Sequence, residues 1–165
     1  MQNPLLATHQ FPLFDQIKPE HIKSAVENLL EKNRAAFSKL LPTESPTWNT
    51  VIAPLDEVEN QLSHAWSIVK HLKSVAHSDE LTKAYRECLP MVSDYLTELS
   101  QNPILYDAYQ KISHSEELST FTEAQKKAIE HNLRDFKLSG IDLPEKAKQR
   151  YASIIKELSD LENQF

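Results

Sequence analysis

The sequence contains a single glycine, Gly140, among 165 residues. Proteins on average use glycine for roughly 7% of their residues, and sheet proteins need it repeatedly for hairpin turns and bulges. Its scarcity argues for helices that are separated by other stop signals, and the nine prolines are suited to that role. One glycine also excludes glycine-rich phosphate loops and the G-x-S-x-G motif, because both need several glycines.

The sequence also has only one cysteine, no excess of basic residues and no long hydrophobic run. The one cysteine, Cys88, cannot form an internal disulfide, which fits a reducing cytoplasm. A net charge of −6 without a basic stripe argues against a nucleic-acid partner. No apolar run approaches the roughly 20 residues of a transmembrane helix, and the first residues do not have the pattern of a signal peptide. We therefore predict a cytoplasmic domain without a nucleic-acid or membrane partner.

Apolar residues recur at helical spacing along the chain, which predicts an all-α fold, a bundle of about six helices. Proline or an N-cap residue precedes each apolar stripe, so we expect long helices to begin near residues 19, 54, 79, 103, 122 and 144. Thr47 is expected to cap a short additional helix that carries Trp48 and Ile52. Pro90 is expected to bend the third long helix.

Gly140 follows the end of the helix that begins at Thr122, where a residue in the left-handed conformation closes the last turn. Leu143 and Pro144 then open the next helix. A connection of about five residues is typical of two antiparallel neighbours. The sequence therefore predicts that the fold ends in an antiparallel helical hairpin around Gly140.

The last predicted helix has an apolar residue at every third or fourth position and runs to the final residue without a stop signal. We expect the chain to be part of a longer protein, although a native C-terminus that frays in solvent is the alternative. The stripe would then be exposed and would favour self-association. Its members are Ala147, Tyr151, Ile154, Leu158, Leu161 and Phe165.

No catalytic or metal-binding constellation emerges from the motifs. None of the seven histidines is followed by glutamate, so the zinc-binding motif H-E-x-x-H is absent. His64 and His71 could share a helix face, but no third and fourth ligands accompany them. His131 and Asp135 are one helical turn apart and also lack further ligands. We interpret both pairs as packing or surface residues.

Other reactive side chains have structural interpretations as well. Ser67-x-x-Lys70 and Ser153-x-x-Lys156 match S-x-x-K, but the companion motifs are missing, so both matches are attributed to chance. Cys88 is expected to be a small buried residue. We therefore predict no catalytic, cofactor-binding or metal-binding residue in this chain. We expect the acids Asp79, Glu80, Glu116 and Glu117 to be helix caps or solvated side chains. We expect Trp48 and Trp66 to be core anchors.

The stretch LRDFKLSGIDLP, residues 133–144, resembles the thimet oligopeptidase-like zinc metallopeptidases, the M3 family. FPLFDQIKPEHIKSAV at 11–26 and SDELTKAYRECLP at 78–90 are similar to the same family, and the likeness extends over essentially the whole chain. The resemblance implies one helical N-terminal domain, residues 1–165, of a longer cytoplasmic enzyme that cleaves short peptides. The domain would form a wall of the substrate channel.

The resemblance also places the zinc site, H-E-x-x-H with a distal glutamate, beyond the position of Phe165. Zinc is therefore expected in the parent enzyme and not in this part, which would be inactive alone and would pack on the missing catalytic domain. Two alternatives remain open: a stand-alone helical module that binds a peptide or a partner protein, and a truncated paralogue that regulates the full enzyme. The reading frame beyond codon 165 distinguishes them.

Overall fold

The computed structural model describes residues 3–7, 11–41, 43–76 and 78–162, and all regular structure within them is helical. The all-α prediction is confirmed, and so is the expectation of about six helices. None of the described helices is both long and apolar enough to cross a bilayer. The α-helices are α1 (Pro19–Leu40), α2 (Ala53–Val75), α3 (Asp79–Ser100), α4 (Pro103–Ser113), α5 (Glu123–Leu138) and α6 (Glu145–Glu162).

The helices begin where the local signals predict. Proline occupies one of the first two positions of α1, α2 and α4, where its missing N–H leaves no hydrogen bond unmade. At the start of α3, the Leu81 backbone N–H donates to Ser78 Oγ at 3.1 Å. The short helix expected after Thr47 is a five-residue π-helical turn, Trp48–Ile52, that continues directly into α2.

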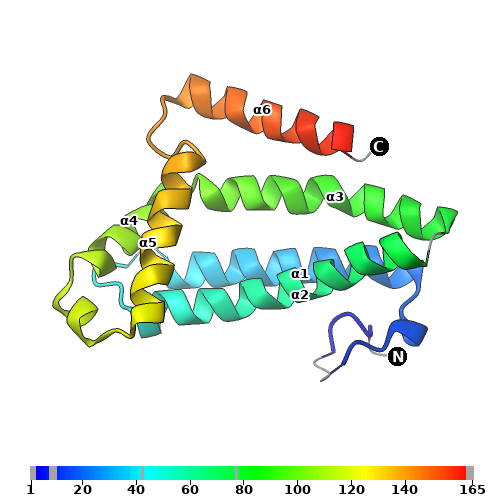
Figure 1. Ribbon diagram of the computed structural model, residues 1–165, viewed down its shortest axis with the longest axis horizontal. Coiled ribbons are helices and arrows are strands. Elements are labelled where there is room, and N and C mark those ends of the chain that lie inside the picture. Colours follow the sequence, from blue (N-terminus) through cyan, green and yellow to red (C-terminus); the bar gives the residue numbers. More distant parts are fainter. Residues whose placement is uncertain (1–2, 8–10, 42, 77, 163–165) are drawn as a thin grey trace.

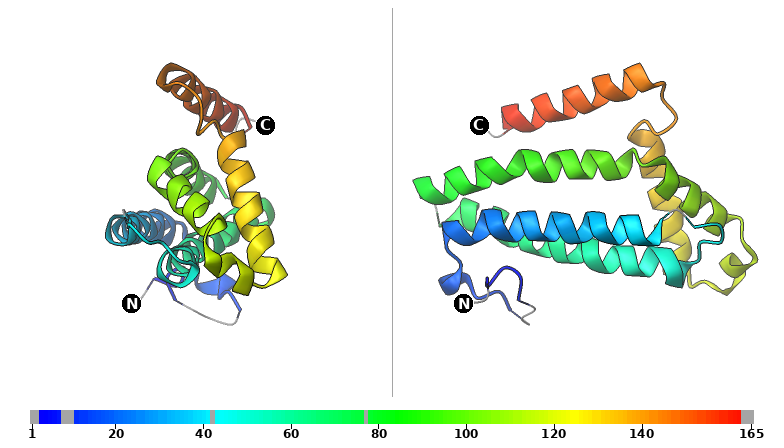
Figure 2. Two further views of the ribbon diagram at one scale, coloured as in Figure 1. Left: turned by 90° about the vertical axis from the view of Figure 1, so that its left-hand side faces the viewer. Right: turned by 180° about the vertical axis from the view of Figure 1, so that it is seen from behind.

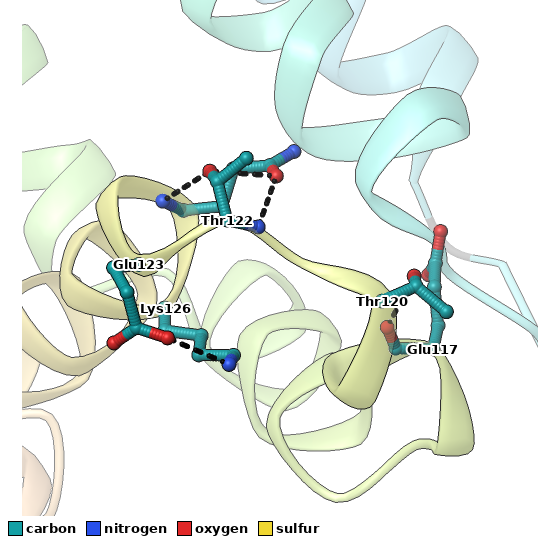
Figure 3. Close-up of polar contacts among 6 residues, drawn as sticks. Glu117, Thr120, Thr122, Glu123 and Lys126 are labelled. Carbon is teal, nitrogen blue, oxygen red and sulfur yellow. Dashed lines mark hydrogen bonds and ion pairs between the residues drawn. The ribbon is translucent and has the colours of Figure 1, made fainter.

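The start of α5 is fixed by a reciprocal pair of hydrogen bonds between Thr122 and Gln125. The Gln125 backbone N–H donates to Thr122 Oγ1 at 3.3 Å, and the Thr122 N–H donates to Gln125 Oε1 at 3.0 Å. An ion pair of 2.9 Å between Lys126 and Glu123 follows in the first turn (Figure 3). The predicted capping box is therefore confirmed.

Helices α1, α2 and α3 form a three-helix bundle along the long axis of the molecule (Figure 1). Successive helices run in opposite directions, and the other two views show the same arrangement (Figure 2). Fully buried side chains between them include Ile22, Val26, Val69 and Cys88. A second core lies at one end, where α4 and α5 pack across the bundle and bury Ile112 and Ile129.

One polar side chain is fully buried inside the three-helix bundle. In the amide orientation that pairs all of its polar atoms, Asn33 of α1 donates from its amide nitrogen to the carbonyl oxygens of Val58 and Leu29, at 3.0 and 3.1 Å. Its amide oxygen accepts a hydrogen bond of 3.2 Å from the Tyr95 hydroxyl of α3. This one side chain therefore links all three helices, and its polar atoms are paired as burial requires.

Gly140 ends α5 in the manner that its sequence position predicts. Its φ is +80°, and the backbone hydrogen bonds from Gly140 to Lys137 and from Ile141 to Phe136, both 3.0 Å, form a Schellman motif. Ile141 and Phe136 are both buried in the second core, which supplies the apolar contact that usually accompanies this motif. The chain therefore turns at this glycine.

Replacing Gly140 by alanine should lower the free energy of unfolding by about 1–2 kcal/mol, because a side chain at positive φ is strained. The new Cβ would also lie 2.6 Å from Leu143 Cδ1. Urea unfolding checks this, with the exposed Lys146→Ala as a control that should change stability by less than about 0.5 kcal/mol. When Gly140→Ala is made in a Leu143→Ala background, the steric part of the loss should be absent. An equal loss in the wild-type and Leu143→Ala backgrounds would contradict the steric contribution.

Helices α5 and α6 do not pack as the antiparallel pair that was predicted around Gly140. Helix α5 lies across the end of the bundle, whereas α6 runs back along α3 (Figure 1). The reason is that α5 already buries its apolar face against α4: the Phe136 ring lies 5.5 Å from that of Tyr106 and 5.7 Å from that of Tyr109. Because this face of α5 is already buried, α6 packs against α3 instead.

Candidate functional site

A cavity lies between α3 and α6, and we refer to it as the α3–α6 groove. Its volume is about 570 Å³. Helices α4 and α5 contribute residues where α6 begins, and α2 contributes Glu59 and Trp66. Apolar and aromatic side chains dominate the lining: Leu89, Val92, Leu96 and Leu99 of α3, Leu105 and Tyr109 of α4, Phe136 of α5, and Tyr151, Ile155 and Leu158 of α6.

The α6 wall is open to solvent. None of the α6 side chains that the structure describes is buried, and Ile154, Leu158 and Leu161 are 45%, 49% and 46% exposed. Leu96 on the opposite wall is 54% exposed. The expectation that the last helix presents an apolar face to solvent is confirmed for these residues, while Phe165 lies outside the described part of the chain. A contiguous apolar surface of this kind is typical of an interaction site.

Glu59 of α2 is an ionisable side chain of the lining that lies in a strongly perturbed environment. Its pKa is raised to about 7, mainly by burial and in addition by the nearby negative charge of Asp56. Within the described residues, its carboxylate makes neither an ion pair nor a hydrogen bond. Burial, followed by the charge of Glu59, also raises the pKa of the Tyr109 hydroxyl. The groove therefore combines apolar walls with a carboxylate that lacks a cation.

The histidine pairs considered from the sequence do not form sites. The His71 ring lies 5.5 Å from the Phe14 ring, so it has a packing role. Asp135 accepts two hydrogen bonds, of 2.9 and 2.8 Å, from Arg134, and nothing joins it to His131. Among the described residues, no three His, Cys, Asp or Glu side chains are grouped so that they could hold a metal ion.

The other candidates occupy the structural roles expected of them. The Ser67 hydroxyl donates to the His64 carbonyl oxygen at 2.7 Å, as a helix surface serine often does. Cys88 is fully buried, as expected of a small core residue, and burial is the main cause that raises the pKa of its thiol to about 11. Trp66 stacks on Tyr85 with ring centroids 5.0 Å apart, which confirms it as a core anchor.

The caps and the second tryptophan also agree with their interpretations. Asp79 and Glu80 lie in the first turn of α3, where negative charge is favourable. Glu117 accepts a long hydrogen bond of 3.4 Å from the Trp48 backbone N–H. The Trp48 ring makes an edge contact with Phe121, at a centroid distance of 5.7 Å.

Sequence reasoning did not identify the groove or Glu59. A signal for Glu59 exists, because it lies four residues after Leu55 and three before Leu62, both of which are buried on the apolar face of α2. A carboxylate within such a stripe is either paired or has a raised pKa. The groove itself has no signal in a single stretch of sequence, since its lining comes from five helices.

Comparison with known proteins places this fold in a family. A family model described as the N-terminal domain of neurolysin/thimet oligopeptidase matches residues 26–148. Over its whole length the chain is 48% identical to oligopeptidase A of Haemophilus influenzae and 42% identical to oligopeptidase A of Escherichia coli. A probable cytosolic oligopeptidase A of Arabidopsis thaliana is 29% identical over 99% of the chain.

The chain covers 24% of each of the two bacterial relatives and 23% of the plant protein, so it spans about a quarter of their length. The family model and the relatives agree with the resemblance seen in LRDFKLSGIDLP. The relatives match along all of the helices described above, whereas the family model extends from within α1 to the beginning of α6. The chain therefore belongs to the neurolysin/thimet oligopeptidase family and represents its N-terminal domain.

Proposed function

We propose that these 165 residues are the N-terminal helical domain of a cytoplasmic zinc-dependent oligopeptidase that hydrolyses short peptides. The observation that carries the proposal is the 48% identity along the entire chain to a protein named oligopeptidase A, of which the chain covers 24%. In this proposal the domain forms one wall of the substrate channel. Zinc and the catalytic residues belong to the part of the parent protein that follows.

The helical construction suits such a wall. Rigid helices on either side of a reaction centre limit the size of what can enter, so a peptidase could admit short peptides and exclude folded proteins. Here α1, α2 and α3 pack through two cores and the buried Asn33 contact, which is the kind of packing that such a wall requires. Neither a nucleophile nor a metal ligand is assigned to the described residues.

The full-length product of the gene should hydrolyse a short internally quenched peptide and leave a folded protein intact. A zinc chelator should abolish the hydrolysis and added zinc should restore it, because a metal-activated water is the expected nucleophile. The 165-residue chain measured in parallel should show no turnover above background. A stop codon directly after residue 165, or chelator-sensitive turnover by the 165 residues alone, would contradict the proposal.

A second candidate function is favoured by the α3–α6 groove. An apolar groove can accept the apolar face of an amphipathic helix, so the chain could act as a stand-alone module that binds a peptide or a partner protein. A truncated paralogue that regulates the intact enzyme is a variant of this reading. Both require a stop codon after residue 165, and the paralogue would also bind the full peptidase in a pull-down.

A further inference from the structure

The α3–α6 groove leaves apolar side chains open on both of its walls. Leu96 of α3 and Leu158 of α6 each expose about half of their surface. Ile154 and Leu161, which are not part of the lining, extend the apolar surface of α6 beyond it. Removing such side chains from water is favourable, so the groove favours an apolar occupant.

The charges around Glu59 favour a cation. Lys70 and Asp56 lie with Glu59 along a neighbouring hollow, but Glu59 forms an ion pair with no described residue. Asp135 adds a second carboxylate to the lining and is already paired with Arg134. A basic side chain that entered the groove would meet an unpaired carboxylate in apolar surroundings, where ion pairs are strongest. The charge of Glu59 also acts on the hydroxyl groups of Tyr95 (α3) and Tyr109 (α4), and Tyr151 (α6) belongs to the same lining as Glu59.

We propose that the α3–α6 groove seats an amphipathic helix from the part of the parent polypeptide that follows residue 165, and that a lysine or arginine of this helix pairs with Glu59. This inference rests on the proposed function in one respect: the polypeptide must continue beyond residue 165. About three quarters of the length of the relatives lies outside these residues. A segment on the same chain binds at high effective concentration.

The charge of the domain argues for this occupant over a second copy. Each copy carries a net charge of −6. In a two-fold symmetric contact through this groove, the Glu59 and Asp135 carboxylates of both copies would lie in one interface, and like charges in an interface are repulsive. A downstream helix can instead supply the complementary positive charge.

Photo-crosslinking of the full-length protein tests the occupant. A benzoylphenylalanine at Leu158, inside the groove, should crosslink to a peptide from beyond residue 165 of the same polypeptide, as identified by mass spectrometry. The control position is Lys156, which is exposed on α6 and about 200° away from Leu158 around the helix; it should not give this product. Mixed isotope labelling separates a second copy from the same chain. A crosslink to a second copy or to another protein, or none at all, would overturn the proposal.

Charge exchange tests the pairing with Glu59. Glu59→Lys should lower the yield of the Leu158 crosslink about tenfold, the effect of losing roughly 1.4 kcal/mol of docking energy. Glu57→Lys, at an exposed position of the same helix, should leave the yield unchanged. Replacing the basic residue nearest to the crosslinked site by glutamate should restore the yield in the Glu59→Lys background. A yield that is insensitive to Glu59→Lys, or that is not restored, would overturn the ion pair.

The milder Glu59→Gln guards against misfolding of the lysine variant, since glutamine keeps the shape of the side chain. It should lower the crosslink yield while the circular dichroism spectrum stays that of the wild type, and an unchanged yield would again overturn the pairing. Hydrolysis and crosslinking are separate readouts. A protein that crosslinks but does not hydrolyse peptides would contradict the proposed function alone, and an active peptidase without the crosslink would contradict the inference alone.

Discussion

Replacing Asn33 by leucine should lower the free energy of unfolding of the 165-residue chain by about 2–3 kcal/mol, even though leucine is similar in volume and more apolar. Asn33 is fully buried and accepts a hydrogen bond from the Tyr95 hydroxyl. Leucine would leave that hydroxyl without a partner in the core, and the desolvation of the hydroxyl would no longer be offset. Chemical denaturation with urea, followed by circular dichroism, measures the loss.

A double-mutant cycle separates the hydrogen bond from packing. Tyr95→Phe alone should cost about 1–2 kcal/mol, because it leaves the buried Asn33 amide oxygen unpaired. The double variant should lose clearly less than the sum of the two single losses, since it removes both polar partners together. Asn60→Leu, at an exposed position of α2, is the matched control and should have little effect. Additive losses in the cycle would contradict a direct contact between Asn33 and Tyr95.

The beginnings and ends of the helices could be predicted because their causes are local. The Thr122 cap needs only Gln125 three residues later, and the stop at Gly140 needs only a residue that tolerates positive φ. The direction of α6 could not be predicted in this way. It depends on which face of α5 is already buried, and the contacts of Phe136 with Tyr106 and Tyr109 become known only when α4 is placed.

The apolar face of α6 was predicted only in part. Tyr151 and Leu158 belong both to the predicted stripe and to the groove lining, whereas Ile155 lines the groove but was not in the stripe. A repeat of 3.5 residues drifts relative to a straight helix of 3.6 residues per turn, so a stripe derived from heptads rotates away from the true contact face. Glu59 was missed for a different reason, because its raised pKa depends on burial by helices that are distant in sequence.

Glu59→Gln should make the 165-residue chain more stable at pH 8 by about 2 kcal/mol and should change its stability little near pH 4.5. The sign follows from the pKa, which is about 7 in the folded chain against an ordinary value of 4.5. Between these values the native state binds more protons than the unfolded state. The wild type therefore loses stability as the pH rises from about 5 through 7, and a neutral glutamine removes this loss.

Urea unfolding of both proteins across this pH range gives the difference directly, and comparison with wild type cancels the titration of histidines common to both. Glu57→Gln, an exposed carboxylate two residues away on α2, should show no such pH-dependent gain. In the full-length protein the sign should reverse. If a lysine or arginine of a downstream helix pairs with Glu59, the charged carboxylate becomes the favoured form in the native state, and glutamine should then destabilise the docked arrangement at pH 8. A stabilising Glu59→Gln in both proteins would mean that the carboxylate remains unpaired in the complete chain. A destabilising effect in the 165-residue chain would mean that its burial is not the dominant influence.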